Sequence, residues 1–207
     1  SDFSITSMDV LGGQLKQIAK IENQKSLSIT CSQDNSKNIF LGTENMGLIM
    51  IGPDGCEIFD ESKGCPSNNI LSMTYFDDNL YLGFSGCLAK FDPKTKTFDI
   101  ISSYKAVQAN NSLDGGEFYR IISMISDPKY DSIWFTISSG NRHPGIWKYN
   151  TNNDTLNFVC ESDSTKRLIF NNDDNILFVY GSLRILNPKS NDSTYLKSYS
   201  KDVESCL

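Results

Sequence analysis

The chain has 207 residues and a net charge of −6. An acidic balance offers no basic stripe to a phosphate backbone, so binding to nucleic acid or to an anionic membrane surface is not expected. Hydrophobic residues make up 39% of the sequence and aromatic residues 11%, which indicates a folded domain with a substantial core. No apolar run approaches the roughly 18 residues of a membrane-spanning helix, so no membrane insertion by this chain is expected.

The N-terminal region predicts a β-hairpin over residues 5–21. Ile5 to Leu11 and Gln14 to Ile21 are strand-like stretches, and the turn signal Gly12-Gly13 separates them. The Ala, Lys and Gln content of residues 14–20 also fits a short helix. We expect the hairpin to complete or extend the structure that follows.

A four-fold repeat of paired apolar segments follows the hairpin. The first segments of the pairs start at Ile39, Leu80, Ile133 and Ile176, and glycines open the second segments at Gly47, Gly86, Gly145 and Gly181. Short β-type segments that recur at this spacing are typical of β-propeller blades.

We therefore expect an all-β fold, a single β-propeller domain over residues 1–207 with about four to five four-stranded blades. The approximate blade boundaries are residues 26–64, 65–103, 119–162 and 166–200. Turn signals such as Pro53-Asp54-Gly55 and Asp77-Asp78 separate the predicted strands. Three arrangements stay open: a ring closed by the hairpin, a piece of a larger ring, or a ring completed by a second chain through self-association.

Two polar loops, residues 104–118 and 138–144, interrupt the repeat. Long loops on a rigid scaffold often carry the binding residues of a protein. A histidine can act as a base near neutral pH and an arginine can clamp a carboxylate, although a solvated loop would contain the same residue types. The candidate ligand-binding residues in and beside these loops are Glu117, Arg120, Asn141, Arg142 and His143.

The sequence predicts no catalytic residue, metal site or cofactor. It contains one histidine, no C-x-x-C pair and no nucleophile elbow. The acidic pairs Asp77-Asp78 and Asp173-Asp174 lack a full calcium loop and occupy turn positions, where aspartate is favoured. Trp134 and Trp147 could form a sugar-stacking platform, but aromatic residues on neighbouring strands of one blade are more often core.

Six cysteines are present. Cys56 and Cys65 flank one loop and form a disulfide candidate, with two free thiols as the alternative. An extracellular compartment would favour the bridge.

The second repeat contains the motifs Pro66-Ser67-Asn68-Asn69-Ile70, Leu80-Tyr81-Leu82-Gly83 and Lys90-Phe91-Asp92-Pro93. These motifs resemble the two-component-regulator propeller repeat, and other copies keep Leu41-Gly42-Thr43 and Leu186-Asn187-Pro188. The resemblance implies a sensing domain of a bacterial hybrid sensor kinase, periplasmic or extracellular, which often recognises polysaccharide fragments.

We expect a non-enzymatic, sensor-like propeller that recognises a small molecule, a glycan or a protein partner. The alternative is a carbohydrate-active or lyase-type enzyme on a propeller scaffold, which would need Arg142, His143 and Glu117 to share a cleft. A purely structural module of a larger assembly is a third possibility.

Overall fold

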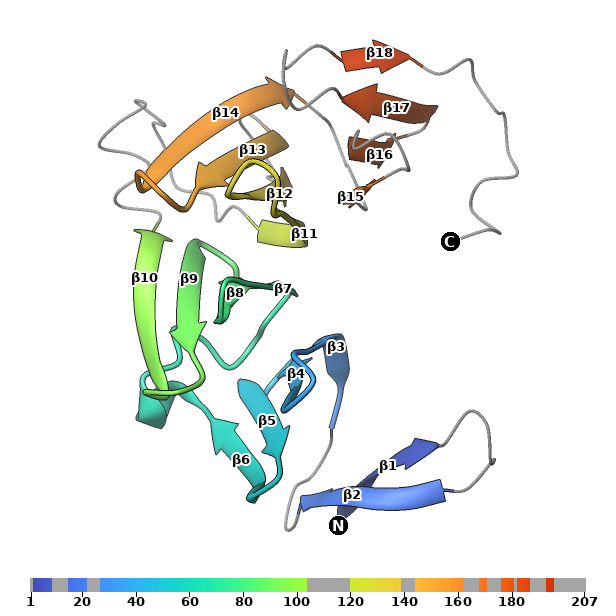
Figure 1. Cartoon of the computed structure of the whole chain (residues 1–207), viewed down its shortest axis with the longest axis vertical. Helices are drawn as coiled ribbons and strands as arrows, with labels where there is room; N and C mark the ends of the chain where they lie inside the picture. The colour runs from blue at the N-terminus through green and yellow to red at the C-terminus, as the bar shows by residue number, and fades with distance from the viewer. Residues whose placement is uncertain are drawn as a thin grey trace. The chain divides into compact units, whose positions relative to one another are not determined.

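The computed structural model describes residues 2–8, 15–21, 27–103, 120–138 and 144–161, and four short strands between residues 168 and 195. Within these ranges every regular element is a β-strand, apart from the short 3-10 turn η1 (Glu61–Lys63) (Figure 1). No helix of this part of the chain is long and apolar enough to cross a membrane. The expected all-β fold is therefore confirmed.

The described strands form four four-stranded sheets and one two-stranded sheet (Figure 1). In each four-stranded sheet, neighbours along the chain are neighbours in space, which is the order of a propeller blade. Blade one contains β3 (Ile29–Asp34), β4 (Ile39–Thr43), β5 (Leu48–Gly52) and β6 (Gly55–Phe59). Blade two contains β7 (Ser72–Phe76), β8 (Asn79–Gly83), β9 (Cys87–Asp92) and β10 (Thr97–Ser103).

The remaining strands follow the same order. Blade three contains β11 (Arg120–Asp127), β12 (Ser132–Ser138), β13 (Gly145–Asn150) and β14 (Thr155–Glu161). Blade four contains β15 (Leu168–Phe170), β16 (Ile176–Tyr180), β17 (Ser182–Leu186) and β18 (Ser193–Tyr195). The two-stranded sheet is the predicted N-terminal hairpin, β1 (Phe3–Met8) and β2 (Leu15–Ile21), so residues 15–20 are a strand and the helical alternative is wrong.

The paired segments of the four repeats are confirmed as the middle strands of the four blades. The motif Pro66–Ile70 of the second repeat precedes β7, which starts at Ser72. The Ile70 amide donates to the Thr43 carbonyl of blade one at 2.9 Å, so it is not part of the β7–β8 ladder. The entry to blade two is therefore fixed to the blade before it.

The Asp77-Asp78 turn is structural. Both residues have positive φ, 46° and 62°, as the two central residues of a type I′ hairpin turn require. The Asn79 side-chain amide donates to the Asp77 carbonyl at 2.8 Å and supports the turn. Within the described residues, no three His, Cys, Asp or Glu side chains gather as metal ligands.

The chain divides into two compact units, Ser1–Phe84 with Ala89–Ile100 and Ser85–Leu88 with Ile101–Leu207. In the first unit, both faces of blade one pack against neighbouring side chains. One face meets blade two, where the Phe40 and Tyr75 rings stack at 6.1 Å and the Phe59 and Phe91 rings lie 5.0 Å apart. The opposite face meets the N-terminal hairpin through a cluster of buried residues, which are Ile21, Leu41, Met46, Ile49 and Ile51.

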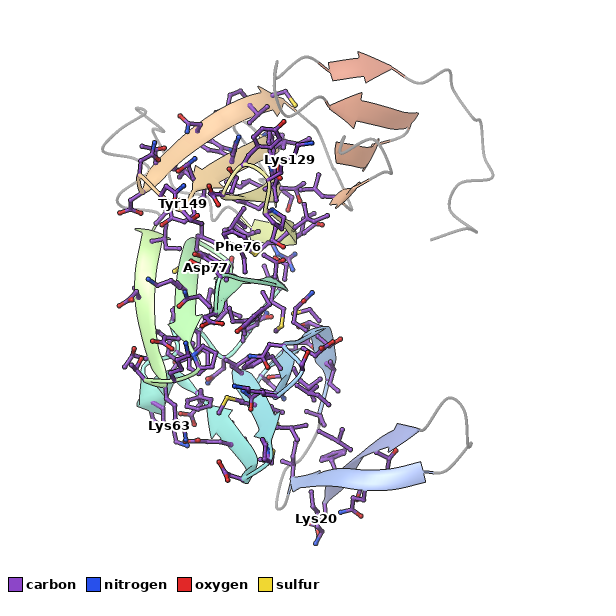
Figure 2. The ribbon with its side chains drawn as sticks, viewed as in Figure 1. Lys20, Lys63, Phe76, Asp77, Lys129 and Tyr149 are labelled. Carbon is purple, nitrogen blue, oxygen red and sulfur yellow. The ribbon has the colours of Figure 1, made fainter. Side chains whose placement is uncertain are left out.

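In the second unit the two tryptophans are part of the core of blade three. Trp134 is fully buried with Ile146 and Leu168, and its Nε1 donates to Asp127 Oδ2 at 3.2 Å. Trp147 is 5% exposed and packs edge-on against Phe158. The prediction that these tryptophans are core residues and no sugar platform is confirmed. Figure 2 shows the described side chains as sticks on the strands, with Tyr149 of β13 labelled.

Two glycines with similar backbone conformations give a matched stability test. Gly47 and Gly64 have φ of +75° and +89°, a region that costs other residues about 1–2 kcal/mol. A Cβ on Gly47 would collide with the Phe59 carbonyl, whereas a Cβ on Gly64 would meet nothing within 4 Å. We expect Gly47→Ala to lower the free energy of unfolding by about 1–3 kcal/mol more than Gly64→Ala, as measured by urea unfolding. Equal losses would show that the collision is relieved without cost.

The buried Asp127–Trp134 hydrogen bond gives a second test. Asp127→Ala leaves the indole N–H without its acceptor, which costs about 1–3 kcal/mol for a buried group. Asp127→Asn keeps an acceptor oxygen at the same place and should recover most of this loss. Urea unfolding of both variants measures the difference, and a destabilisation that Asn does not relieve would assign the role of Asp127 to its charge.

Candidate functional site

One end of blade three carries both of the predicted insertions. Arg120 pairs with Ser138, and Gly145 pairs with both Ile137 and Glu161, so the start of β11, the end of β12 and the start of β13 lie at the same end of the sheet. Residues 104–119 precede β11 and residues 139–144 join β12 to β13. The two insertions are therefore attached side by side, and we call this the loop end of blade three.

Arg120 is the one candidate residue that the structure describes. It is exposed at the first position of β11 and forms an isolated bridge with Ser85, in the connection between β8 and β9. Glu117, Asn141, Arg142 and His143 lie outside the described residues, so their gathering around a ligand stays a prediction. The structure places the strand ends that carry them next to Arg120.

Two buried polar atoms near this end lack a hydrogen-bond partner in the described part of the chain. They are Thr136 Oγ1 of β12 and Trp147 Nε1 of β13, on the two strands that residues 139–144 connect. Cross-strand pairing puts Thr136 opposite Ile146 and Trp147 opposite Phe135, so they lie on opposite faces of the sheet. An unpaired buried donor costs about 1–3 kcal/mol, and such groups in native proteins often mark a functional place. Sequence reasoning favoured a core role for Trp147 and did not predict the unpaired indole N–H.

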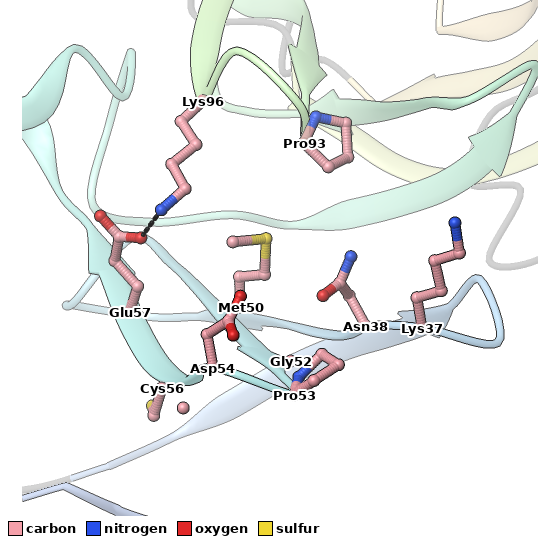
Figure 3. Close-up of a pocket in the computed structure, with 11 residues that line it drawn as sticks. Lys37, Asn38, Met50, Gly52, Pro53, Asp54, Cys56, Glu57, Pro93 and Lys96 are labelled. Atoms are coloured by element: carbon pink, nitrogen blue, oxygen red, sulfur yellow. Dashed lines mark hydrogen bonds and ion pairs between the residues drawn. The ribbon is translucent and has the colours of Figure 1, made fainter.

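Short turns of the first unit line a separate cleft of about 520 Å³ (Figure 3). It is lined by the β3–β4, β5–β6 and β9–β10 turns, including Lys37, Asn38, Met50, Asp54, Glu57 and Lys96. Lys96 and Glu57 form an ion pair across it at 2.5 Å. A neighbouring hollow of about 610 Å³ shares Lys37, Asn38, Gly52 and Pro53. The sequence did not predict this cleft because its residues come from three separate turns.

Cys56 and Cys65 are free thiols, so the structure carries the alternative to the predicted disulfide. The Cys56 side chain packs with the hydrophobic cluster beneath the N-terminal hairpin. Cys65 is buried, and its thiol donates to the Ser67 carbonyl at 3.1 Å. Burial raises the pKa of Cys65 to about 11 and also raises the pKa of Cys56. Both thiols are therefore protonated near neutral pH and poor nucleophiles.

This arrangement predicts the alkylation pattern of the cysteines. At pH 8 a thiol of pKa about 11 is ionised in only about one molecule in a thousand, so native Cys65 should react with iodoacetamide at least about 100-fold more slowly than in the unfolded chain. Mass spectrometry of peptides after labelling measures both rates. After unfolding without reductant, Cys56 and Cys65 should both be labelled. A peptide that joins them would contradict the free-thiol state.

Solved structures of similar fold include extracellular domains of putative one- and two-component systems. The extracellular domain of the putative one component system BT4673 from B. thetaiotaomicron matches with a TM-score of 0.74 and 15% identity, over 97% of this chain and 26% of that chain. The extracellular domain of the putative hybrid two component system BT3049 from the same organism matches with a TM-score of 0.65 and 11% identity, over 94% and 30% of the two chains. Saccharomyces cerevisiae Sqt1 matches with a TM-score of 0.66 and 14% identity, over 94% and 55%.

These comparisons establish the fold. No model of a protein family matches the chain, and no curated protein matches it in sequence. The propeller fold that the resemblance implied is shared with extracellular domains of putative one- and two-component systems. The chain spans about a quarter of the length of the BT4673 domain, so it corresponds to a part of that larger structure.

Proposed function

We propose that this chain is a recognition module of a sensor that lies in the periplasm or outside the cell, and that it binds its ligand without transforming it. The observation that carries this proposal is the attachment of both long insertions at one end of blade three, on strands fixed by a buried core. Binding residues on loops gain precision when the scaffold beneath them is rigid. The fold likeness to extracellular sensor domains supports the same role.

A polysaccharide fragment is the ligand class that we propose first. The resemblance of blade two to the two-component-regulator repeat implies this class. Sugars are recognised through many hydroxyl groups, each of which needs a donor or an acceptor, and the insertions are rich in polar residues such as Asn110, Asn111 and Asn141. Arg120, exposed beside both insertions, can donate several hydrogen bonds to the same ligand. A protein partner at this end is the other possible outcome.

Transmission of the signal would use the rigidity of the blades. A ligand that binds both insertions would favour one arrangement of them, and a ligand shifts an equilibrium only by its difference in affinity between two states. Because the Ser85–Arg120 bridge joins the β8–β9 connection to the start of β11, a change at Arg120 would also reach this connection.

The proposal predicts that binding depends on the loop end and not on the turn end of blade three. Arg120→Ala should weaken the binding of an oligosaccharide at least about tenfold, which corresponds to the loss of one or two charge-assisted hydrogen bonds. Lys129→Ala is the matched control, because Lys129 is an exposed cation in the turn at the other end of β11 (Figure 2). Isothermal titration with ligands chosen from a bacterial polysaccharide digest measures both.

A second variant removes the two insertions together, with residues 105–117 and 139–143 each replaced by a short glycine-asparagine turn. The proposal expects loss of binding with retained thermal unfolding. Unchanged binding by this variant would count against recognition at the loop end. Turnover of an oligosaccharide by the unaltered chain, abolished in His143→Ala, would replace the proposal with the enzymatic alternative.

A further inference from the structure

The N-terminal hairpin occupies only the outer half of a blade. It contains two described strands, whereas the other four sheets contain four each. Strand β2 packs against β6, the outermost strand of blade one, and leads along the chain toward β3, the innermost strand. The outermost strand of one blade likewise leads to the innermost strand of the next between β6 and β7. Strands β1 and β2 therefore take the third and fourth positions of a blade, and the first two positions lie beyond the edge of β1.

Blade one shows what these two positions would cover. Cys31 pairs with Gly42 and Ser72 pairs with Gly83, so the repeat aligns Ile29 of blade one with Ile70 of blade two. Ile70 is 0% exposed, because it packs on blade one close to Gly42. Ile29 is 49% exposed and is one of three exposed large hydrophobic residues in the described part of the chain. The same repeat position is thus buried in Ile70, which packs against a complete four-stranded blade, and half exposed in Ile29, which faces only the two-stranded hairpin.

A second aligned pair shows the same contrast. Ile39 of blade one corresponds to Leu80 of blade two, since each opens the core segment of its repeat. Leu80 is 0% exposed, whereas Ile39 is only half-buried against the hairpin cluster. The inner part of blade one therefore carries apolar side chains that the hairpin covers only in part.

The outer face of the hairpin is polar, which favours extension of the sheet along β1 over stacking of another sheet on this face. Phe3 and Ile5 of β1 pack toward blade one, whereas Ser4, Thr6 and Gln17 are exposed on the opposite side. A polar face does not favour the stacking of another sheet, so an added element would continue the sheet through the backbone groups along β1. An edge strand with unpaired N–H and C=O groups is a template for such pairing.

We propose that the edge of β1 is a docking site for a partner protein's β-hairpin of the same repeat type as β7–β8, which completes a four-stranded blade over Ile29. The hairpin would contribute backbone hydrogen bonds to β1 and large side chains at alternate positions against Ile29. This site is independent of the loop end of blade three and of the proposed function.

A second copy of the chain does not fit this site. Antiparallel pairing of β1 with β1 of another copy is symmetric about an axis perpendicular to the sheet, which keeps the packed faces of both hairpins on one side. Blade one of the second copy packs against this same side of its own hairpin. It would therefore occupy the space that β3 and β4 of the first copy already fill. The occupant is therefore a strand pair without a blade of its own behind it.

The test supplies the missing hairpin from the chain itself. Residues Ile70–Gly86, which contain β7 and β8, are copied in front of Phe3 and replace Ser1 and Asp2. In the native chain Gly86 directly precedes β9, and in the extended chain the copied Gly86 would precede β1 in the same way. In the extended chain Ile29→Ala should lower the melting temperature by roughly 5 °C or more, since it would empty a buried site. In the unextended chain the same substitution should lower it by less than about 2 °C.

A matched control carries Tyr81→Lys within the copied segment. Tyr81 pairs with Thr74 and lies on the face opposite Met73 and Leu82, so the copy would place it against blade one. The control extension should remove the added effect of Ile29→Ala. Equal effects of Ile29→Ala in the unextended and extended chains would overturn the proposal.

Hydrogen exchange of the unextended chain adds an independent result. The proposal expects a monomer by light scattering in which the outward amides of β1 exchange freely. Slow exchange along both edges of β1 in the monomer would mean that the chain fills the site itself. A dimer with the same protection would mean that a second copy does. Either result overturns the proposal.

Discussion

The structure depends on one constraint, which is that the middle strands of each blade are apolar on both faces and must be covered on both. Phe40 is 0% exposed and its neighbour Leu41 is 6% exposed, although their side chains point to opposite faces of β4. In β12 the consecutive residues Ile133, Trp134 and Phe135 are all buried to within 1%. A sheet of this kind cannot be stable alone, because one exposed face would leave several large side chains in water. Packing of repeated sheets against one another covers these faces.

Close face-to-face packing explains why particular residues recur. Gly42 stands where a Cβ would lie 2.9 Å from both Ile70 and Met73, so blade two can approach blade one only over a glycine. The Ile70 amide uses this approach to bond the Thr43 carbonyl. The ends of the strands do not share the constraint, and loops of any length can be attached there. The fold thus separates a fixed interior from variable ends, and the proposed recognition uses the ends.

Much of the fold could be predicted from the sequence because the constraint leaves a periodic signal. The four core segments and their glycine-opened partners located the middle strands of every blade, and β9 starts at Cys87, directly after the predicted opening glycine Gly86. The tryptophans were correctly assigned to the core, since neighbouring strands of one blade bring them into the interior. For residues 15–20, composition alone left strand and helix open, because only the antiparallel pairing of Ile5 with Ala19 and its neighbours decides between them.

The candidate site could be predicted only in part. Sequence reasoning found the two insertions, but their attachment side by side follows from the register of β11, β12 and β13. The turn-end cleft combines residues as distant as Lys37 and Lys96, and no local pattern records such a combination. The state of Cys56 and Cys65 depends on the direction of two side chains, which a spacing of nine positions does not determine.

Hydrogen exchange measured along the chain, with and without an oligosaccharide digest, is the most direct test of recognition at the loop end of blade three. Recognition there predicts slower exchange in peptides from residues 104–120 and 138–146, and no change at the Asp127–Asp131 turn of the same sheet. Protection confined to the turn-end cleft around Lys37 and Asn38 would contradict it, because binding would then involve the short turns of the first unit and not the insertions of blade three.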